Sequence, residues 1–555
     1  MTTSTTTPTT PTPTSQDATF KSKDKLLANL RDEIEKARVL NGVPGMSVAV
    51  MHKGEVIFAE GFGLRNDKDL FTAETLIPIG SITKCFTATA IGELVAEKKL
   101  DWDETPVNKY LPEFELKNPM HTAQITITDL LSHRTGLSRL NDMPFYLGQM
   151  SRSEMVRRLR YADMPAKLGS KSLYNNCMYG VAGEVAAKVT GQSYEDVVRS
   201  KIITPLGLDS TGLSAKEMKS RSDNHAIPMV AASFEDAQKG LFKSIPSYDD
   251  SAMLIAAAGD IYSNVLDLVK WGQVVSKLGE LDGKQVLNRN SVEETLKAHT
   301  IVDSAPRTAE FPRVSNYGFG WDVDSYKGLP VYRHSGNTFY YASHLAFFPD
   351  QDLVVAACAN TYVTYLTVEL PHHVADLVLN LPSTQDWLFD VALEKITKFW
   401  AMIAAEQDVT PDKIPNKPMS HPLQAYVGEY SHPYYGSCNV WLEDLEEGEE
   451  GKEGAGEDKN KTLVSTLWDC RTLISHLHFD AFVLKHDHPG LHATYVASFH
   501  TGSSGKVTSI NLELGEDTIE FKRHKEVKEE EKDEMEEGKE GKKNAADGVP
   551  QAHVD

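Results

Sequence analysis

The chain of 555 residues is too long for one ordinary hydrophobic core, because domains average roughly 150 residues. Hydrophobic residues make up 41% of it and charged residues 25%, which is typical of a soluble globular protein. The formal net charge of -22 argues against a nucleic-acid partner, since binding phosphates requires a basic face. The five cysteines include no Cys-x-x-Cys pair, so neither a disulfide framework nor a zinc site is expected.

Membrane-spanning and export signals are both missing from the sequence. No apolar run approaches the ~18 residues that a membrane-spanning helix needs. The first residues are threonines, serine and prolines, without the basic and apolar regions of a secretory signal. We therefore expect a cytoplasmic protein with no membrane partner.

The first elements in the chain are a tail, a helix and a hairpin. Residues 1–20 form a Thr/Pro tract with too little apolar surface to fold, and are predicted to be disordered. Apolar residues along one side predict an amphipathic helix over 23–40. Two apolar runs, 46–51 and 56–59, are joined by turn residues and predict a β-hairpin.

Residues 81–95 predict a helix with a buried face, because apolar side chains recur mostly at steps of three, four and five. Ser81 opens this helix, and Lys84 lies on the same face of its first turn. A serine hydroxyl is a poor nucleophile until a base takes its proton. Burial and a helix N-terminus lower the pKa of a lysine, so Lys84 qualifies as that base. The same Ser-x-x-Lys pattern recurs at 22–25 and 503–506, but neither copy opens an apolar helix.

Helices are predicted next along the chain, and strands follow them. The predicted helices cover residues 126–131, 178–189 and 261–271, and Thr128 is the predicted cap of the first. The predicted strands cover residues 329–333, 343–348 and 353–359. We expect these strands to pair with the N-terminal hairpin. That pairing closes one antiparallel sheet from both ends of the domain.

Two further motifs stand where side chains are well placed to point into a cleft. Tyr174 and Asn176 lead into a predicted helix, and His334 and Gly336 end a predicted strand. A tyrosine phenol ordinarily has a pKa near ~10. Beside Lys84 its anion is stabilised, so it can relay a proton to a leaving group.

Taken in order, these motifs resemble those of the serine β-lactamase and penicillin-binding-protein family, in its class C and carboxylesterase-like branch (peptidase S12 type). The resemblance covers roughly residues 23–381. It is supported by the segments Val43–Gly45, Asp129–Leu137, Pro205–Leu208 and Tyr317–Trp321. It implies a β-lactamase-like α/β (α+β) fold, with an antiparallel sheet flanked by helices, for a catalytic domain over 21–382.

The resemblance also implies an acyl-enzyme mechanism that uses no metal and no organic cofactor. Ser81 attacks the carbonyl carbon, and Lys84 and Tyr174 share the proton that leaves it. Asn176 orients Lys84 and the acyl side chain of the substrate. The backbone N–H groups of Ser81 and Asn337 form the oxyanion hole.

The chain departs from the family at the motif that contains His334 and Gly336. Many members carry lysine at the position of His334, and histidine titrates near neutrality, so its positive charge is conditional. A substrate carboxylate therefore loses a reliable anchor. After Asn337, residues Phe339–Tyr341 are more aromatic than usual there, and they either line a pocket for an apolar acyl group or pack as a lid. His133 lies in a supporting segment and is expected to be a satisfied internal hydrogen bonder.

The last part of the chain differs in character. A helix and a proline-rich linker are predicted over 383–422, and a small all-β barrel over 423–523. The barrel looks like the lipocalin-like appendage of some family members, with a role either in ligand binding or in packing against the catalytic domain. An acidic, Gly-rich insert interrupts it at 446–459, and the acidic tail 524–555 is predicted to be disordered.

The leading hypothesis is a serine hydrolase that acts on esters or amides of small molecules. The alternatives are an acyltransferase of secondary metabolism and a D-amino-acid amidase or peptidase, since the acceptor leaves no covalent trace in a sequence. A catalytically silent binding protein is a third possibility, opposed by the intact Ser81, Lys84 and Tyr174. We expect turnover of short-chain activated esters and little hydrolysis of β-lactams. The sequence does not reveal the oligomeric state.

Overall fold

The computed structural model describes residues 15–139, 150–245, 254–302, 310–311, 315–338, 340–362, 364–406, 412–444, 461–468, 470–486, 494–514 and 517–524. Most of the predicted Thr/Pro tail, the acidic insert, Phe339 and almost all of the acidic tail lie outside these residues. The chain divides into two compact units, with the boundary between Val409 and Thr410.

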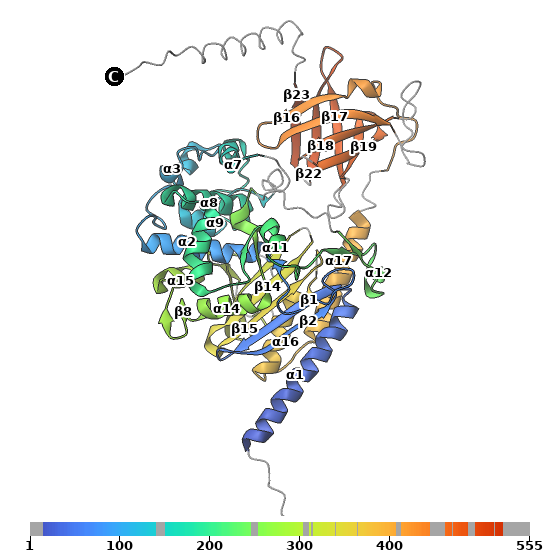
Figure 1. Ribbon diagram of the computed structural model, residues 1–555. Helices are drawn as coiled ribbons and strands as arrows, with labels where there is room; N and C mark the ends of the chain where they lie inside the picture. The colour runs from blue at the N-terminus through green and yellow to red at the C-terminus, as the bar shows by residue number, and fades with distance from the viewer. Residues whose placement is uncertain are drawn as a thin grey trace, which may run out of the picture. The chain divides into compact units, whose positions relative to one another are not determined.

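An eight-stranded sheet forms the centre of the first unit (Figure 1). Neighbouring strands pair antiparallel throughout it. In spatial order the strands are β10 (Thr300–Ile301), β11 (Asn316–Tyr317), β12 (Asp322–Tyr326), β13 (Leu329–Asn337), β14 (Ala342–Phe348), β15 (Leu353–Ala359), β1 (Gly45–His52) and β2 (Glu55–Gly63). Val48 of β1 lies opposite Ala357 of β15, so the predicted closure of the sheet from both ends of the domain is confirmed.

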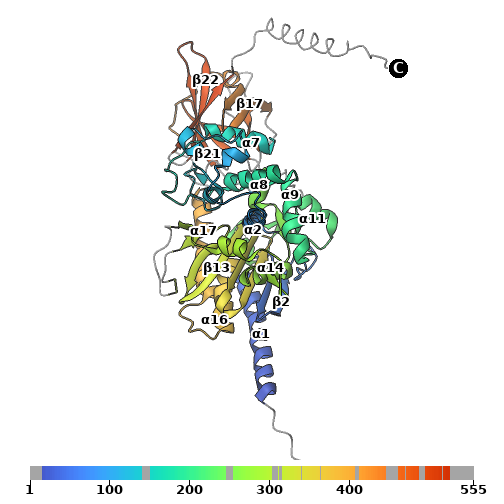
Figure 2. The same ribbon diagram turned by 90° about the vertical axis from the view of Figure 1, so that its left-hand side faces the viewer.

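Helices flank this sheet on both faces, and α8 lies beside α2 (Figures 1 and 2). The helices are α1 (Ser15–Leu40), α2 (Thr83–Ala96), α3 (Val107–Tyr110), α4 (Pro119–Thr122), α5 (Ile127–Leu131), α7 (Arg152–Arg158), α8 (Asn176–Thr190), α9 (Tyr194–Val198), α10 (Thr204–Leu206), α11 (Ala215–Arg221), α12 (Phe234–Gln238), α13 (Ala256–Gly259), α14 (Val265–Ser276), α15 (Arg289–Leu296), α16 (Leu366–Val378) and α17 (Ala392–Glu406). Short strands complete the unit: β3 (Ile77–Pro78), β4 (Gly212–Leu213), β5 (Met229–Val230), β6 (Lys243–Ser244), β7 (Ile261–Ser263), β8 (Glu280–Leu281) and β9 (Lys284–Gln285).

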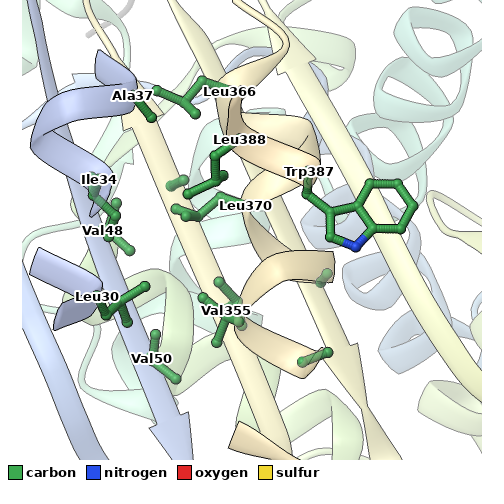
Figure 3. Packing of buried hydrophobic residues seen from close by; sticks show 14 of the residues in the cluster. Leu30, Ile34, Ala37, Val48, Val50, Val355, Leu366, Leu370, Trp387 and Leu388 are labelled. Atoms are coloured by element: carbon green, nitrogen blue, oxygen red, sulfur yellow. The ribbon is translucent and has the colours of Figure 1, made fainter. Parts of the chain in front are cut away.

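Helices α1 and α16 cover one face of the sheet with a cluster of buried hydrophobic side chains (Figure 3). Leu30 and Ile34 of α1 belong to this cluster with Val48, Val355 and Leu370. Burying an aliphatic side chain of this size stabilises the fold by about 1.5–3 kcal/mol. Helix α1 starts eight positions earlier than predicted, since the prolines that oppose a helix all precede it.

Helix α14 packs on the opposite face, where Gly272 allows a close approach. A Cβ at Gly272 would lie 2.6 Å from Cγ1 of Val354 and 3.2 Å from Cδ1 of Leu345. The predicted helix start at 261 is wrong, because residues 261–263 form β7 instead. Asn264 ends that strand and caps the helix by accepting a hydrogen bond from the Asp267 backbone N–H at 2.9 Å.

The start of α5 also differs from the prediction. Thr126, and not Thr128, is the cap of this helix, and Asp129 closes a capping box with it. The Asp129 carboxylate accepts a hydrogen bond from the backbone N–H of Thr126 at 2.9 Å. An acidic residue three positions after a threonine is the sequence signal for this arrangement.

The second unit is a closed barrel of eight antiparallel strands, so the all-β prediction is confirmed. Its strands are β16 (Gly428–His432), β17 (Gly436–Asp444), β18 (Lys461–Leu467), β19 (Cys470–His478), β20 (Ala481–His486), β21 (Thr494–Thr501), β22 (Val507–Leu514) and β23 (Asp517–Arg523). The likeness to lipocalins stays a prediction. Among the helices of the described ranges, none combines the length and hydropathy that crossing a membrane requires.

Candidate active site

Ser81 lies in a short 3-10 turn, Gly80–Ile82, that leads directly into α2. Its Oγ accepts a hydrogen bond from Nζ of Lys84 at 2.9 Å and another from the hydroxyl of Tyr174 at 2.8 Å. The serine, lysine and tyrosine of the predicted site therefore meet at one oxygen atom. That oxygen has two possible proton acceptors within direct reach.

Lys84 is completely buried behind Ser81. Besides Ser81, its Nζ donates a hydrogen bond to the backbone carbonyl of Ala258 at 2.9 Å. The same nitrogen lies 4.8 Å from the centre of the Tyr174 ring and 5.4 Å from that of Tyr179. Ring faces and a carbonyl oxygen attract a cation, so this environment holds the amine in one position.

Tyr174 is positioned by the start of α8. The side chain of Asn175 caps that helix, since it accepts a hydrogen bond from the backbone N–H of Met178 at 3.1 Å. Its amide nitrogen also donates to the carbonyl of Ser138 at 2.8 Å. Asn176 is the first residue of α8 and is buried, but it does not line the pocket described below. The cap role of Asn175 was missed in the sequence, although an asparagine just before an apolar helix is its usual signal.

Strand β13 passes very close to the turn that carries Ser81, and two glycines permit the approach. A Cβ at Gly336 would lie 1.9 Å from the carbonyl oxygen of Ile79. A Cβ at Gly80, whose φ is +50°, would lie 2.8 Å from the backbone nitrogen of Asn337. The backbone of Asn337 therefore lies against the residue that precedes Ser81.

His334 lies on the same strand, and both of its ring nitrogens are engaged within the protein. Nδ1 is 2.6 Å from the carbonyl oxygen of Ser335, which can only accept, so Nδ1 carries the proton. Nε2, 3.0 Å from the hydroxyl of Tyr317, then accepts a hydrogen bond from it. Burial, together with the charge of Lys84, lowers the pKa of His334 to about 3. The expectation that His334 titrates near neutrality is therefore wrong, and the ring is neutral at that pH.

These residues surround a pocket of about 370 Å³. Of the predicted site residues, Ser81, Tyr174, His334 and Asn337 line it. Further lining residues, which were not predicted, include Arg139, Ser172, Val302, Tyr317 and Asp322. Tyr317 opens a segment that supported the family resemblance, but nothing in the local sequence singles out the other four, because they reach the pocket from separate loops and strands.

The aromatic run after β13 does not line this pocket where it is described. Tyr340 and Tyr341 are each 2% exposed, and the Tyr341 hydroxyl donates to the carbonyl of Ala226 at 2.9 Å. Of the two alternatives, packing rather than an apolar pocket wall therefore holds for these two tyrosines.

His133 also lines the pocket, and the prediction for it is correct only in part. Its Nδ1 accepts a hydrogen bond from the backbone N–H of Asn175 at 3.2 Å. Its Nε2 is buried and has no hydrogen-bond partner in the described part of the chain. Burial, and next the charge of Lys84, keeps the pKa of His133 well below its usual range. The neutral ring lies 4.3 Å from the Tyr174 ring and packs against it.

The described residues contain no group of three or more His, Cys, Asp or Glu side chains arranged to hold a metal ion.

Comparison with known proteins identifies the family of the chain. The family described as Beta-lactamase matches residues 30–378, and a Domain of unknown function (DUF3471) matches residues 412–529. The unguisins hydrolase of Aspergillus campestris is 28% identical over 505 residues, which cover 87% of this chain and 89% of that protein.

Two solved structures share the fold. The octameric penicillin-binding protein homologue from Pyrococcus abyssi has a TM-score of 0.55 at 22% identity, over 89% of this chain and 99% of that one. EstCE1, a hydrolase with promiscuous acyltransferase activity, has a TM-score of 0.53 at 20% identity, over 64% of this chain and 99% of that one. The chain belongs to the β-lactamase family and is a serine hydrolase.

Proposed function

We propose that this hydrolase cleaves esters or amides of small molecules through an acyl-enzyme on Ser81. The observation that carries the proposal is the pair of hydrogen bonds at Ser81 Oγ, 2.9 Å from Lys84 and 2.8 Å from Tyr174, at the wall of a pocket. A hydroxyl held between two groups that can take its proton is an activated nucleophile.

In the first half of the reaction, Ser81 Oγ forms a bond to the carbonyl carbon of the substrate. Its proton passes to whichever of the Lys84 amine and the Tyr174 phenolate is unprotonated, since both lie within direct reach. The bond to the leaving oxygen or nitrogen then breaks, and the same proton moves to that atom. In the second half, water takes the place of the leaving group and releases the acid and Ser81.

The oxyanion of each tetrahedral intermediate needs donors close to Ser81. We assign this role to the backbone N–H groups of Ser81 and Asn337. The close packing of Asn337 against Gly80 supports the assignment, because it brings the peptide unit of Asn337 close to the turn that carries Ser81. One such donor typically contributes about 10²–10³ in rate.

The neutral state of His334 bears on the substrate. A ring with both nitrogens engaged in the protein offers no cation to a substrate carboxylate. This favours activated esters without a carboxylate over β-lactams, which carry one.

The test uses Ser81→Ala with a matched control, Ser503→Ala, which alters an exposed serine in another Ser-x-x-Lys copy. We expect Ser81→Ala to remove labelling by a fluorophosphonate probe and to lower kcat on p-nitrophenyl butyrate by several orders of magnitude. Ser503→Ala should match the wild type in both assays. Peptide mapping of the label to another residue, or turnover retained in Ser81→Ala, would overturn the assignment.

A substrate panel then tests the preference. On one preparation, kcat/KM is compared for p-nitrophenyl butyrate, a D-amino-acid amide and a chromogenic cephalosporin, with Ser81→Ala as the blank. We expect the cephalosporin to be the poorest substrate. If it is the best, the argument from the neutral His334 is wrong.

A further inference from the structure

Asp322 is the one acidic side chain among the described residues that line the pocket. It is the first residue of β12 and lies opposite Arg333 of β13 in the sheet register. Arg333, however, is directed to another carboxylate. Its Nε and Nη2 both donate to Oδ2 of Asp324, at 2.9 and 2.6 Å.

The carboxyl of Asp322 therefore stands in the pocket without a hydrogen-bond donor from the described part of the protein. Its charged form is poorly solvated there, and this burial, which the charge of Arg333 opposes only in part, raises the pKa of Asp322 to about 6. A partly buried carboxylate of this kind is stabilised when a cationic donor comes within hydrogen-bond distance. The pocket wall thus lacks a cationic hydrogen-bond donor for Asp322, which a ligand can supply.

The basic side chains near the pocket do not supply this hydrogen-bond donor. Lys84 donates to Ser81 and Ala258, and His334 is neutral with both nitrogens engaged. Arg139 is exposed, and its guanidinium lies 5.5 Å from the centre of the Tyr174 ring. None of these groups has a hydrogen bond to Asp322.

We propose that Asp322 is a specificity-determining residue that binds an ammonium group of the substrate. The substrate class is then esters or amides that carry a free amino group, such as amides of amino acids. The inference rests on the proposed function, since it names the substrates of the same pocket. The carboxylate of Asp322 accepts hydrogen bonds from the ammonium N–H groups while Ser81 attacks the carbonyl carbon.

Binding is measured first, without turnover, in the Ser81→Ala protein. Calorimetric titration compares alaninamide, which has a free amino group, with N-acetylalaninamide, which does not. Adding Asp322→Asn should weaken alaninamide at least tenfold more than its acetylated twin, because a charged hydrogen bond contributes about tenfold to a hundredfold in affinity. Asn has nearly the same shape as Asp, so the change removes the charge and one acceptor oxygen with little change in volume. Asp282→Asn, an exposed position in the β8–β9 turn, is the matched control and should change neither affinity.

Kinetics with Ser81 intact provide the second measurement. Asp322→Asn should lower kcat/KM for alanine p-nitroanilide ten- to a hundredfold more than for its N-acetyl twin, with the change mainly in KM. Equal losses on both substrates, or equal affinities of alaninamide with and without Asp322, would overturn the inference. Failure of the proposed function is distinguishable from this outcome, because it appears as activity that survives in Ser81→Ala.

Discussion

The close contact at Gly336 makes a sharp prediction about catalysis. In Gly336→Ala, the new Cβ would lie 1.9 Å from the carbonyl oxygen of Ile79 and 2.4 Å from Oγ of Ser343. Real Cβ atoms essentially never approach a neighbour within 3.0 Å, so the Ile79 carbonyl has to retreat by about 1 Å. The side chain of Ser343 can rotate away, but the backbone carbonyl of Ile79 cannot.

The displacement acts directly on the nucleophile. Ile79 is two residues before Ser81, and the turn between them contacts the backbone of Asn337. A misplacement of about 1 Å costs roughly 10²-fold in rate when it separates groups that must act together. We therefore expect kcat of Gly336→Ala to fall about a hundredfold. The stability loss should stay within the ~1–3 kcal/mol that is usual for overpacking.

The assay measures kcat on p-nitrophenyl butyrate, the rate of fluorophosphonate labelling and the free energy of unfolding in denaturant. Gly502→Ala is the control: the one close neighbour of its Cβ would be a methyl group of Thr508 at 2.8 Å, which can turn aside, and the backbone oxygen of Lys506 would be at an ordinary 3.9 Å. The control should keep wild-type kcat. If folded Gly336→Ala also retains wild-type kcat within threefold, the contact does not position Ser81 and our reasoning fails.

Lys84→Ala and Tyr174→Phe should each lower kcat severely, and the double variant should be little worse than either, because the two groups handle one proton; losses that multiply in a double-mutant cycle would contradict this. The pKa of about 3 for His334 lies below the ~6.5 of an unfolded histidine, so the unfolded chain binds the proton first and stability falls as pH drops from about 6.5 toward 3. At pH 5 this loss is about 2 kcal/mol. The free energy of unfolding in urea should therefore fall by about 2 kcal/mol less between pH 7.5 and pH 5 in His334→Gln than in the wild type. An equal fall in both proteins would refute this prediction. Limited proteolysis should cut the chain first between 381 and 423, in the acidic insert or in the acidic tail, and a first cut within 174–271 would argue against these domain boundaries.

The sequence by itself determined the local elements and the identity of the chemical groups. Apolar periodicity placed a helix after Ser81, and a serine three residues before a lysine put both on one face of its first turn. Short apolar runs near both ends of the catalytic domain predicted strands, which we expected to pair in one antiparallel sheet. The separate helices and strands are legible because their signals depend on neighbours close in the chain.

Only the tertiary structure decided how the groups behave. Tyr174 reaches Ser81 across 93 positions, and His334 is neutral because burial and Lys84 act on it from other elements. Asp322 became a candidate for substrate recognition only when β13 turned Arg333 toward another carboxylate. Desolvation, charge and close backbone contacts depend on which segments meet in space, and no local pattern records that.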